Sequence, residues 1–154
     1  MNVQNLKALL DACFLAKRIV ETLPELPEHM KPRHIHVLNV VHEVQQQQNI
    51  CRVSDVSRSL SITMPSVTRL VQELEQLEML EKHPDKEDGR ITLLSLTKKG
   101  EACVLLYVTQ FHSAWAEALD GITDGQAQEA VHIIEELWRT MPSHIDPVKE
   151  PKQA

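Results

Sequence analysis

Apolar residues recur every three or four positions along most of the chain, the spacing of helices with one buried face. In the first of these stretches, Leu6, Leu10, Cys13 and Ile19 fall on one such stripe. Proline residues follow at positions 24, 27 and 32, and each lacks the amide proton that a helix interior needs. The pattern predicts helices over residues 3–22, 32–48, 53–60, 63–80, 97–119 and 123–141.

Three of the predicted helix starts carry their own signals. Thr63 is placed to cap a helix, and Pro65 lies in its first turn, where a missing amide proton costs nothing. Thr97 is expected to cap the next helix. Thr123 and Gln126 have the spacing of a capping box for the last one.

The segment between the fourth and fifth helices has a different period. Residues 81–84 and 90–96 are predicted to be short strands, and Asp88-Gly89 between them is a strong hairpin signal. We expect Gly89 to supply the positive φ that a tight hairpin turn demands.

Two helices joined by a three-residue turn and followed by a hairpin form a winged helix-turn-helix. We therefore predict a mainly α fold with a small β-hairpin wing, and place the winged domain at residues 32–100. The flanking segments, 1–31 and 101–141, are too apolar on one face to stand alone, so we interpret them as dimerisation helices. Residues 142–154 are expected to form a peripheral or disordered tail.

Composition excludes several classes of protein. Residues 1–88 contain no glycine, which rules out a glycine-rich phosphate loop or dinucleotide fingerprint there. No run approaches the roughly 20 apolar residues of a membrane span, and Lys7 and Asp11 interrupt what would be a signal peptide. Three cysteines without a C-x-x-C pair argue against a disulfide framework and favour a cytoplasmic protein.

The net charge of −6 at first argues against a nucleic-acid partner. The charge is unevenly distributed, however: residues 1–51 and 52–100 are each neutral, and residues 101–154 hold three basic against nine acidic groups. The acidity therefore lies outside the predicted winged motif.

Three pieces of sequence follow one another between Val53 and Gly100: residues 53–60, residues 64–74 with a Ser-Val-Thr-Arg core, and residues 85–90 followed by Leu-Thr-Lys-Lys-Gly at 96–100. In this order and spacing they resemble the MarR family of bacterial transcription regulators. The resemblance covers about residues 3–141, and residues 53–100 are its most specific part. The resemblance implies a homodimer with recognition helices in successive major grooves and wing arginines at the minor groove. It also implies a repressor relieved by a small aromatic or phenolic effector. From the residues themselves we expect no cofactor, metal or catalytic site.

The predicted recognition helix, 63–80, presents an outward face of hydrogen-bonding groups. Arginine pairs with guanine, glutamine with adenine, and serine or threonine with either base or with phosphate. The outward face comprises Pro65, Ser66, Thr68, Arg69, Gln72 and Gln76. A solvated face is the alternative, but such faces usually carry Lys and Glu, and this one is mostly neutral before Glu73.

The predicted wing, 82–96, offers Arg90 for the minor groove, where negative potential is highest over narrow A·T tracts. Asp85 is expected to pair with Arg90 or Lys86 and to fix the loop; an exposed ion pair alone is the alternative reading. Phosphate contacts, which position a protein without reading sequence, are predicted for Arg52, Arg58, Lys82, Lys86 and Lys98.

Cys13 lies roughly where organic-hydroperoxide sensors of this family keep a reactive cysteine. Those sensors also use nearby tyrosines, and the one tyrosine, Tyr107, lies in a different segment. A small buried hydrophobe is the favoured reading of Cys13, with a redox-sensing regulator as the alternative.

The histidines are read as satisfied or solvated rather than as metal ligands. His34 and His36 lie about 200° apart on a helix and so do not share a metal there. A metal site formed by convergence of His36, His112 and Cys13 is the alternative.

Three aromatic residues, Tyr107, Phe111 and Trp115, follow one another at intervals of four residues. This spacing fits a place in the core, in a dimer interface or in the wall of an effector pocket.

Two other functions remain open on sequence grounds. The neutral charge of residues 52–100 suits a winged helix that binds protein and no DNA. A hydrolase using Cys13 or Cys103 would need an acid–base pair or oxyanion motif, and neither pattern is present.

Overall fold

The computed structural model describes residues 1–22 and 24–143, so all but the first two residues of the predicted 142–154 tail lie outside it. The chain divides into two compact units, Met1–Ala114 and a second that begins at Trp115. The helices and strands run in the order α1 (Val3–Glu21), α2 (Pro32–Gln48), β1 (Cys51–Arg52), α3 (Val53–Leu60), α4 (Met64–Gln76), β2 (Leu80–Pro84), β3 (Thr92–Leu96), α5 (Lys98–Val104), a π-helical segment (Leu105–Gln110), α6 (Phe111–Ala118) and α7 (Asp124–Thr140). The predicted fold class, mainly α with a small β wing, is confirmed.

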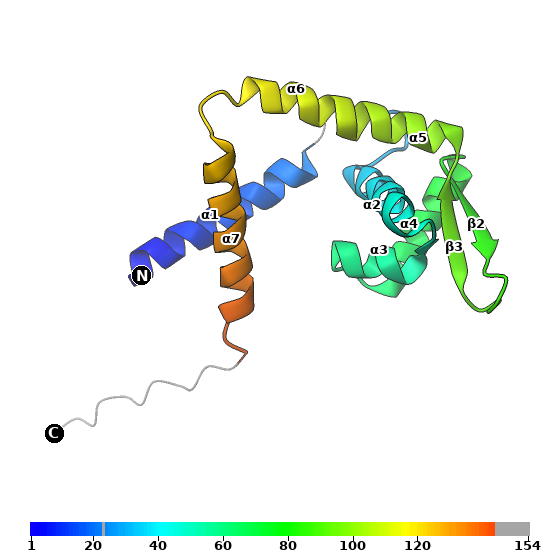
Figure 1. The fold of residues 1–154 in the computed structure, drawn as a ribbon, viewed down its shortest axis with the longest axis horizontal. Helices are drawn as coiled ribbons and strands as arrows, with labels where there is room; N and C mark the ends of the chain where they lie inside the picture. The colour runs from blue at the N-terminus through cyan, green and yellow to red at the C-terminus, as the bar shows by residue number, and fades with distance from the viewer. Residues whose placement is uncertain (23, 144–154) are drawn as a thin grey trace. The chain divides into compact units, whose positions relative to one another are not determined.

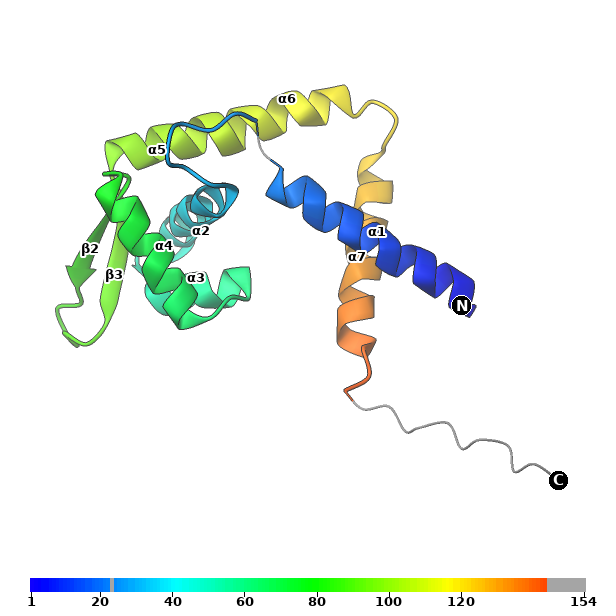
Figure 2. The same ribbon diagram turned by 180° about the vertical axis from the view of Figure 1, so that it is seen from behind.

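The first unit contains the hydrophobic core. Helices α2, α3, α4 and α5 enclose it together with an antiparallel sheet of order β1-β3-β2, and the β2–β3 hairpin projects beside α4 (Figures 1 and 2). Each fully buried aliphatic side chain adds roughly 1.5–3 kcal/mol of hydrophobic stabilisation. The largest of these are Ile35, Leu38, Leu74, Leu80 and Leu94.

The recognition helix is shorter than predicted, because α4 ends at Gln76 and not at residue 80. Glu78 adopts a left-handed φ of 59°, and its amide donates to the Glu75 carbonyl. The Met79 amide donates to the Leu74 carbonyl at 3.0 Å, which completes a Schellman motif. This stop was missed because the left-handed position carries no glycine or asparagine, the residues that usually mark it.

The wing also differs from its prediction. The predicted hairpin gains a third strand, β1, in which Cys51 pairs with Leu94; a two-residue strand is too short for an alternating pattern. Strand β3 begins at Thr92, so Arg90 lies in the loop. The positive φ predicted for Gly89 is wrong, since none of the glycines, all of which the structure describes, adopts one.

Side chains of residues 97–100 satisfy the end of the recognition helix. Thr97 accepts the Gly100 amide as its helix cap, as predicted, and its hydroxyl donates to the Glu78 carbonyl at 2.7 Å. The Lys99 ammonium donates to the Leu77 carbonyl at 2.8 Å. A Cβ on Gly100 would lie 2.1 Å from the Met79 oxygen. The Thr-Lys-Lys-Gly stretch therefore docks α5 against the carbonyls that follow α4.

The long helix after Thr97 contains an interruption that periodicity did not predict. Residues Leu105–Gln110 form a π-helical segment, and α6 continues to Ala118. Such insertions change which residues share a face. Tyr107 accordingly packs half-buried on the core, whereas Trp115 is 41% exposed.

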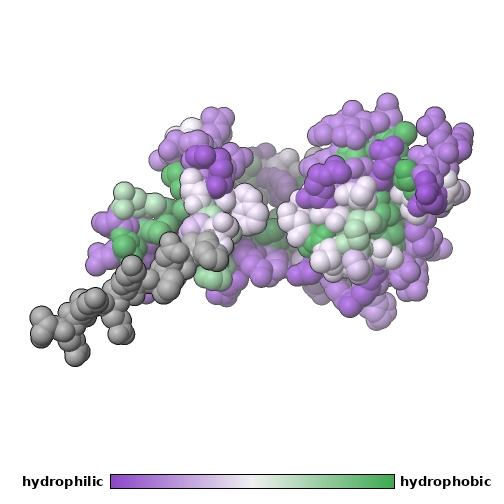
Figure 3. Space-filling view, turned by 90° about the horizontal axis from the view of Figure 1, so that it is seen from below, coloured by the Kyte–Doolittle hydropathy of each residue, from purple (hydrophilic) through white to green (hydrophobic). Residues whose placement is uncertain are grey.

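Helices α1 and α7 expose large apolar side chains and bury none completely. The capping box predicted at Thr123 and Gln126 is present at the start of α7. Along α7, the side chains of Val131, Ile134 and Trp138 are 56%, 50% and 77% exposed. The space-filling view in Figure 3 shows that hydrophobic residues lie exposed among hydrophilic ones on the surface of the protein. No helix in the described part of the chain is long and apolar enough to cross a membrane.

Candidate nucleic-acid interface

The outward face predicted for the recognition helix lies at the surface. Thr63 caps α4 by accepting the Ser66 amide, and the Thr68 hydroxyl donates to the Met64 carbonyl at 3.0 Å. Val67, Leu70, Val71 and Leu74 point into the core. The six predicted side chains are all exposed: Pro65, Ser66, Thr68, Arg69, Gln72 and Gln76.

Arg69 is held by the carboxylate of Glu73, which the sequence analysis considered only as the residue at which the neutral face ends. Its Nε donates to Oε1 of Glu73 at 3.0 Å. The other oxygen, Oε2, lies 2.7 Å from Nε2 of His34 and 3.3 Å from Nζ of Lys31, both at the start of α2. Hydrogen bonds from Arg69, then from His34 and Lys31, lower the pKa of Glu73 to about 2. Glu73 is therefore charged throughout the physiological range.

Buried His34 has one tautomer that satisfies both ring nitrogens. Its side chain is 1% exposed, and Nδ1 accepts the Lys31 amide at 3.2 Å. With Nδ1 as acceptor, Nε2 carries the proton and donates to Glu73. This contact joins α2 to the middle of the recognition helix, and no spacing rule links two positions 39 residues apart.

The wing loop is ordered by its two aspartates. Asp85 Oδ1 accepts the amides of Glu87 and Asp88, so its predicted pairing with Arg90 or Lys86 is wrong. Asp88 instead binds Arg90 through two bonds of 2.9 Å. The sequence does not distinguish Asp85 from Asp88 as the partner of Arg90, because both acids lie within a few residues of it. In the structure Asp85 is already occupied by two backbone amides of the loop, so Asp88 pairs with Arg90.

Arg90 stays accessible while it is held. Its side chain is 91% exposed. The hydrogen bond with Asp88 raises the pKa of Arg90 and lowers that of Asp88. The ion pair orients a guanidinium that remains charged at the tip of the wing.

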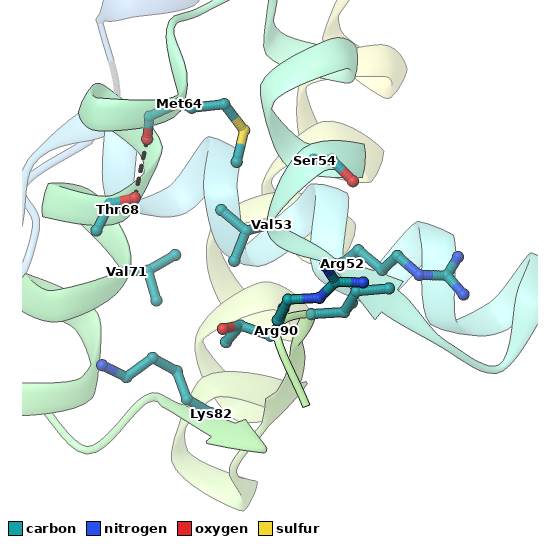
Figure 4. Close-up of a pocket in the computed structure, with 10 residues that line it drawn as sticks. Arg52, Val53, Ser54, Met64, Thr68, Val71, Lys82 and Arg90 are labelled. Carbon is teal, nitrogen blue, oxygen red and sulfur yellow. Dashed lines mark hydrogen bonds between the residues drawn. The ribbon is translucent and has the colours of Figure 1, made fainter. Parts of the chain in front are cut away.

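A cavity of about 420 Å³ lies between the recognition helix and the wing. In Figure 4, Met64, Thr68 and Val71 line it from α4, and Arg90 and Lys82 from the wing. Arg52, at the start of α3, also lines it, and its Nε is buried without a hydrogen-bond partner in the described residues. Three cations therefore surround one concave surface, which suits an anionic partner.

The other cations predicted to contact phosphate differ in whether they form ion pairs. Arg58 lies 3.4 Å from Asp55, and Lys82 lies 2.7 Å from Glu75. Lys86 and Lys98 are exposed and take part in no ion pair within residues 1–22 and 24–143.

Two cations beside the recognition helix were missed. Lys31 and Arg33, at the start of α2, line a hollow of about 360 Å³ together with Ser66 and Arg69. They lie more than 30 residues before the helix they flank, so only the fold brings them to it. Their one sequence signal is the K-P-R run at residues 31–33.

The three cysteines differ in burial, and burial affects the reactivity of their thiols. Burial, and then the nearby Asp55 charge, raises the pKa of the Cys51 thiol to about 12. Burial also raises the pKa of Cys103. Cys13 is half-buried and is not in a disulfide.

These environments predict the labelling pattern with iodoacetamide at pH 7. Cys51 and Cys103 should stay unmodified in the folded protein, because only the thiolate reacts. Any labelling should be confined to Cys13 and proceed no faster than for a free cysteine, as peptide mass spectrometry would show. Labelling of Cys13 well above that rate would support the redox alternative instead.

No cluster of three His, Cys, Asp or Glu suited to a metal occurs in the described residues. His36 Nε2 lies 3.1 Å from the Val20 carbonyl, a partner that satisfies it within the fold.

Fold and surface together define a winged helix-turn-helix protein. Residues 30–91 match the model of the MarR family, and the resemblance predicted from the sequence is confirmed. The matched segment ends inside the wing, so it covers α2, β1, α3, α4 and β2.

Solved structures share the fold beyond that segment. FabT of Streptococcus pneumoniae, in complex with DNA, is 22% identical with a TM-score of 0.66, covering 90% of this chain and 96% of its own. BpsR of Bordetella bronchiseptica is 18% identical with a TM-score of 0.65, covering 87% and 98%. PcaV of Streptomyces coelicolor, with its natural ligand, is 17% identical with a TM-score of 0.62, covering 89% and 91%. At these identities the likeness is one of fold.

Proposed function

We propose that this protein is a sequence-specific DNA-binding transcriptional regulator that acts as a homodimeric repressor. The observation that carries the proposal is the exposed, hydrogen-bonding face of α4 beside a cavity bordered by Arg52, Lys82 and Arg90. A surface that combines neutral base-reading groups with flanking cations has the two kinds of contact that a duplex requires.

Each group has a role in this proposal. In the major groove, Arg69 reads guanine and Gln72 reads adenine, while Ser66 and Thr68 bind base edges or phosphate and Pro65 packs at the groove edge. Arg90 enters the minor groove. Arg52, Arg58 and Lys86 bind phosphates and set the register.

A small organic effector is part of the proposal. The solved structure of BpsR concerns regulation of its DNA binding by 6-hydroxynicotinic acid, and PcaV was solved with its natural ligand. The shared fold supports a small aromatic or phenolic molecule as the signal that releases this regulator from DNA. The regulator has no enzymatic activity in this proposal, and it acts in the cytoplasm, where bacterial DNA lies.

Arg69→Ala and Arg90→Ala test the interface directly. The wild-type protein should bind the duplex that it selects from a randomised pool, and the logarithm of its affinity should fall linearly with the logarithm of salt concentration. Arg69→Ala should weaken discrimination at one base pair by about 10-fold or more, because a bidentate contact is lost. Arg90→Ala should lower affinity about 10-fold and most for A·T-rich flanks. Fluorescence anisotropy titrations would measure both.

Arg139→Ala is the matched control. It removes the same charge from an exposed arginine that is also held by an acid, Glu136, on α7. Its affinity should stay within about twofold of wild type. Absence of duplex binding at low salt, or binding indifferent to Arg69 and Arg90, would support the protein-binding winged helix that the neutral charge of residues 52–100 favours.

A further inference from the structure

One carboxylate on the recognition helix joins three donors at the proposed DNA surface. Glu73 accepts from Arg69, His34 and Lys31 at 3.0, 2.7 and 3.3 Å, and its side chain is 26% exposed. An acid beside a duplex repels phosphate, so its presence here weakens general affinity for DNA. The position of this charge would be explained if Glu73 contributed to discrimination between DNA sequences and not to affinity.

The anchor of Glu73 is rigid on the side away from solvent. His34 is 1% exposed, and its second nitrogen accepts the Lys31 amide at the start of α2, so the ring is fixed from both sides. Glu73 is thereby fixed against α2 and does not move freely with solvent. The position of the Glu73 carboxylate is therefore set by the buried His34 ring, and so by α2.

The face that Glu73 leaves open on Arg69 is the one that reads a base. Only Nε of Arg69 is hydrogen-bonded within the described residues, and the side chain is 74% exposed. Both Nη groups remain available, and they can form the two parallel bonds to O6 and N7 of guanine. A free arginine must lose substantial rotamer freedom to reach that geometry.

We propose that Glu73 is a positioning residue that sets sequence specificity: anchored by His34, it holds the Arg69 guanidinium so that the Nη edge faces the groove before DNA arrives. The inference rests on the proposed DNA-binding function. Pre-orientation lowers the ordering cost of the correct complex. The negative charge meanwhile penalises complexes in which Arg69 swings to a phosphate. Glu73 thus raises discrimination and lowers non-specific affinity.

Glu73→Gln separates these two effects. One amide oxygen remains to accept from His34, but the charge and the second acceptor for Arg69 are lost. Discrimination at the base pair read by Arg69 should fall about three- to tenfold, while affinity for a random duplex should rise about twofold or more. The base pair is identified as the one at which Arg69→Ala loses discrimination, in titrations of every single substitution of the selected duplex.

Glu78→Gln is the control, because it removes the same charge from a residue that follows the same helix. Glu78 forms no ion pair within the described residues. The substitution should leave the specificity profile unchanged. In an Arg69→Ala background, Glu73→Gln should change discrimination no further, which a merely structural role would not produce. Thermal unfolding of each variant verifies that the fold is retained.

Two outcomes would overturn the inference. Equal specificity profiles for Glu73→Gln and Glu78→Gln would show that Glu73 does not position Arg69. A loss of discrimination that persists in the Arg69→Ala background would assign the effect to the packing of α4. Both differ from failure of the proposed function, in which the wild-type protein selects no duplex at all.

Discussion

Ile134→Glu is expected to convert the protein from a dimer into a monomer and to lower its affinity for the selected duplex at least about 100-fold. Ile134 is 50% exposed on α7, between Val131 and Trp138 on one apolar row. Such a row is covered by a partner in our proposal, and a buried, unpaired charge there is costly. Two linked recognition helices gain affinity through their effective concentration, and a monomer loses that gain. Analytical ultracentrifugation and anisotropy on the same samples would measure both changes.

Gln128→Glu is the matched control, because it adds one acidic group to an exposed polar position of the same helix. It should remain dimeric and bind DNA as wild type. A wild-type protein that is monomeric at micromolar concentration, or an Ile134→Glu variant that stays dimeric, would contradict the assignment of α7 to the dimer interface.

Gly100→Ala is expected to lower the free energy of unfolding by about 2–3 kcal/mol, the upper part of the usual range for overpacking. The added Cβ would meet the Met79 carbonyl oxygen at 2.1 Å, and that oxygen is backbone already bonded to the Thr97 amide. The chain must shift where the end of α4 docks on α5. DNA affinity should fall with stability, because the same carbonyls terminate the recognition helix. Urea unfolding followed by circular dichroism would measure the change.

Gly125→Ala provides the opposite expectation in another helix. Apart from its chain neighbours and the backbone of its own helix, no heavy atom lies within 4 Å of the position of its Cβ. Alanine should therefore stabilise α7 by about 0.5–1 kcal/mol through helix propensity. If Gly100→Ala behaved in the same way, the contact between residue 100 and Met79 would not be as close as the structure places it.

Helix boundaries were predictable wherever a local signal exists. The bounds of α2 and α3 match their predictions, and the caps at Thr63, Thr97 and Thr123 are present. Each depends on residues three or four apart, within one turn, so the chain needs no tertiary contact to specify it.

Two of the wrong predictions, the end of α4 and the partner of Arg90, share a physical cause. The left-handed Glu78 ends α4 early because Met79 and Leu80 are buried, which offsets the strain of a non-glycine residue there. Asp88 replaces Asp85 as the partner of Arg90 because Asp85 satisfies two backbone amides. In both places a nearby alternative competes, and packing or hydrogen bonding selects between states of similar energy.

The sequence by itself determined the class of fold and the exposed polar face from Pro65 to Gln76, because the periodicity that predicts both is local. Only the tertiary structure decided how that face is held. His34 and Lys31 approach Glu73 across about 40 residues of chain, and Thr97 and Lys99 reach the carbonyls after α4 across about 20. Contacts of this kind depend on how helices pack, and packing is a property of the whole core rather than of any segment.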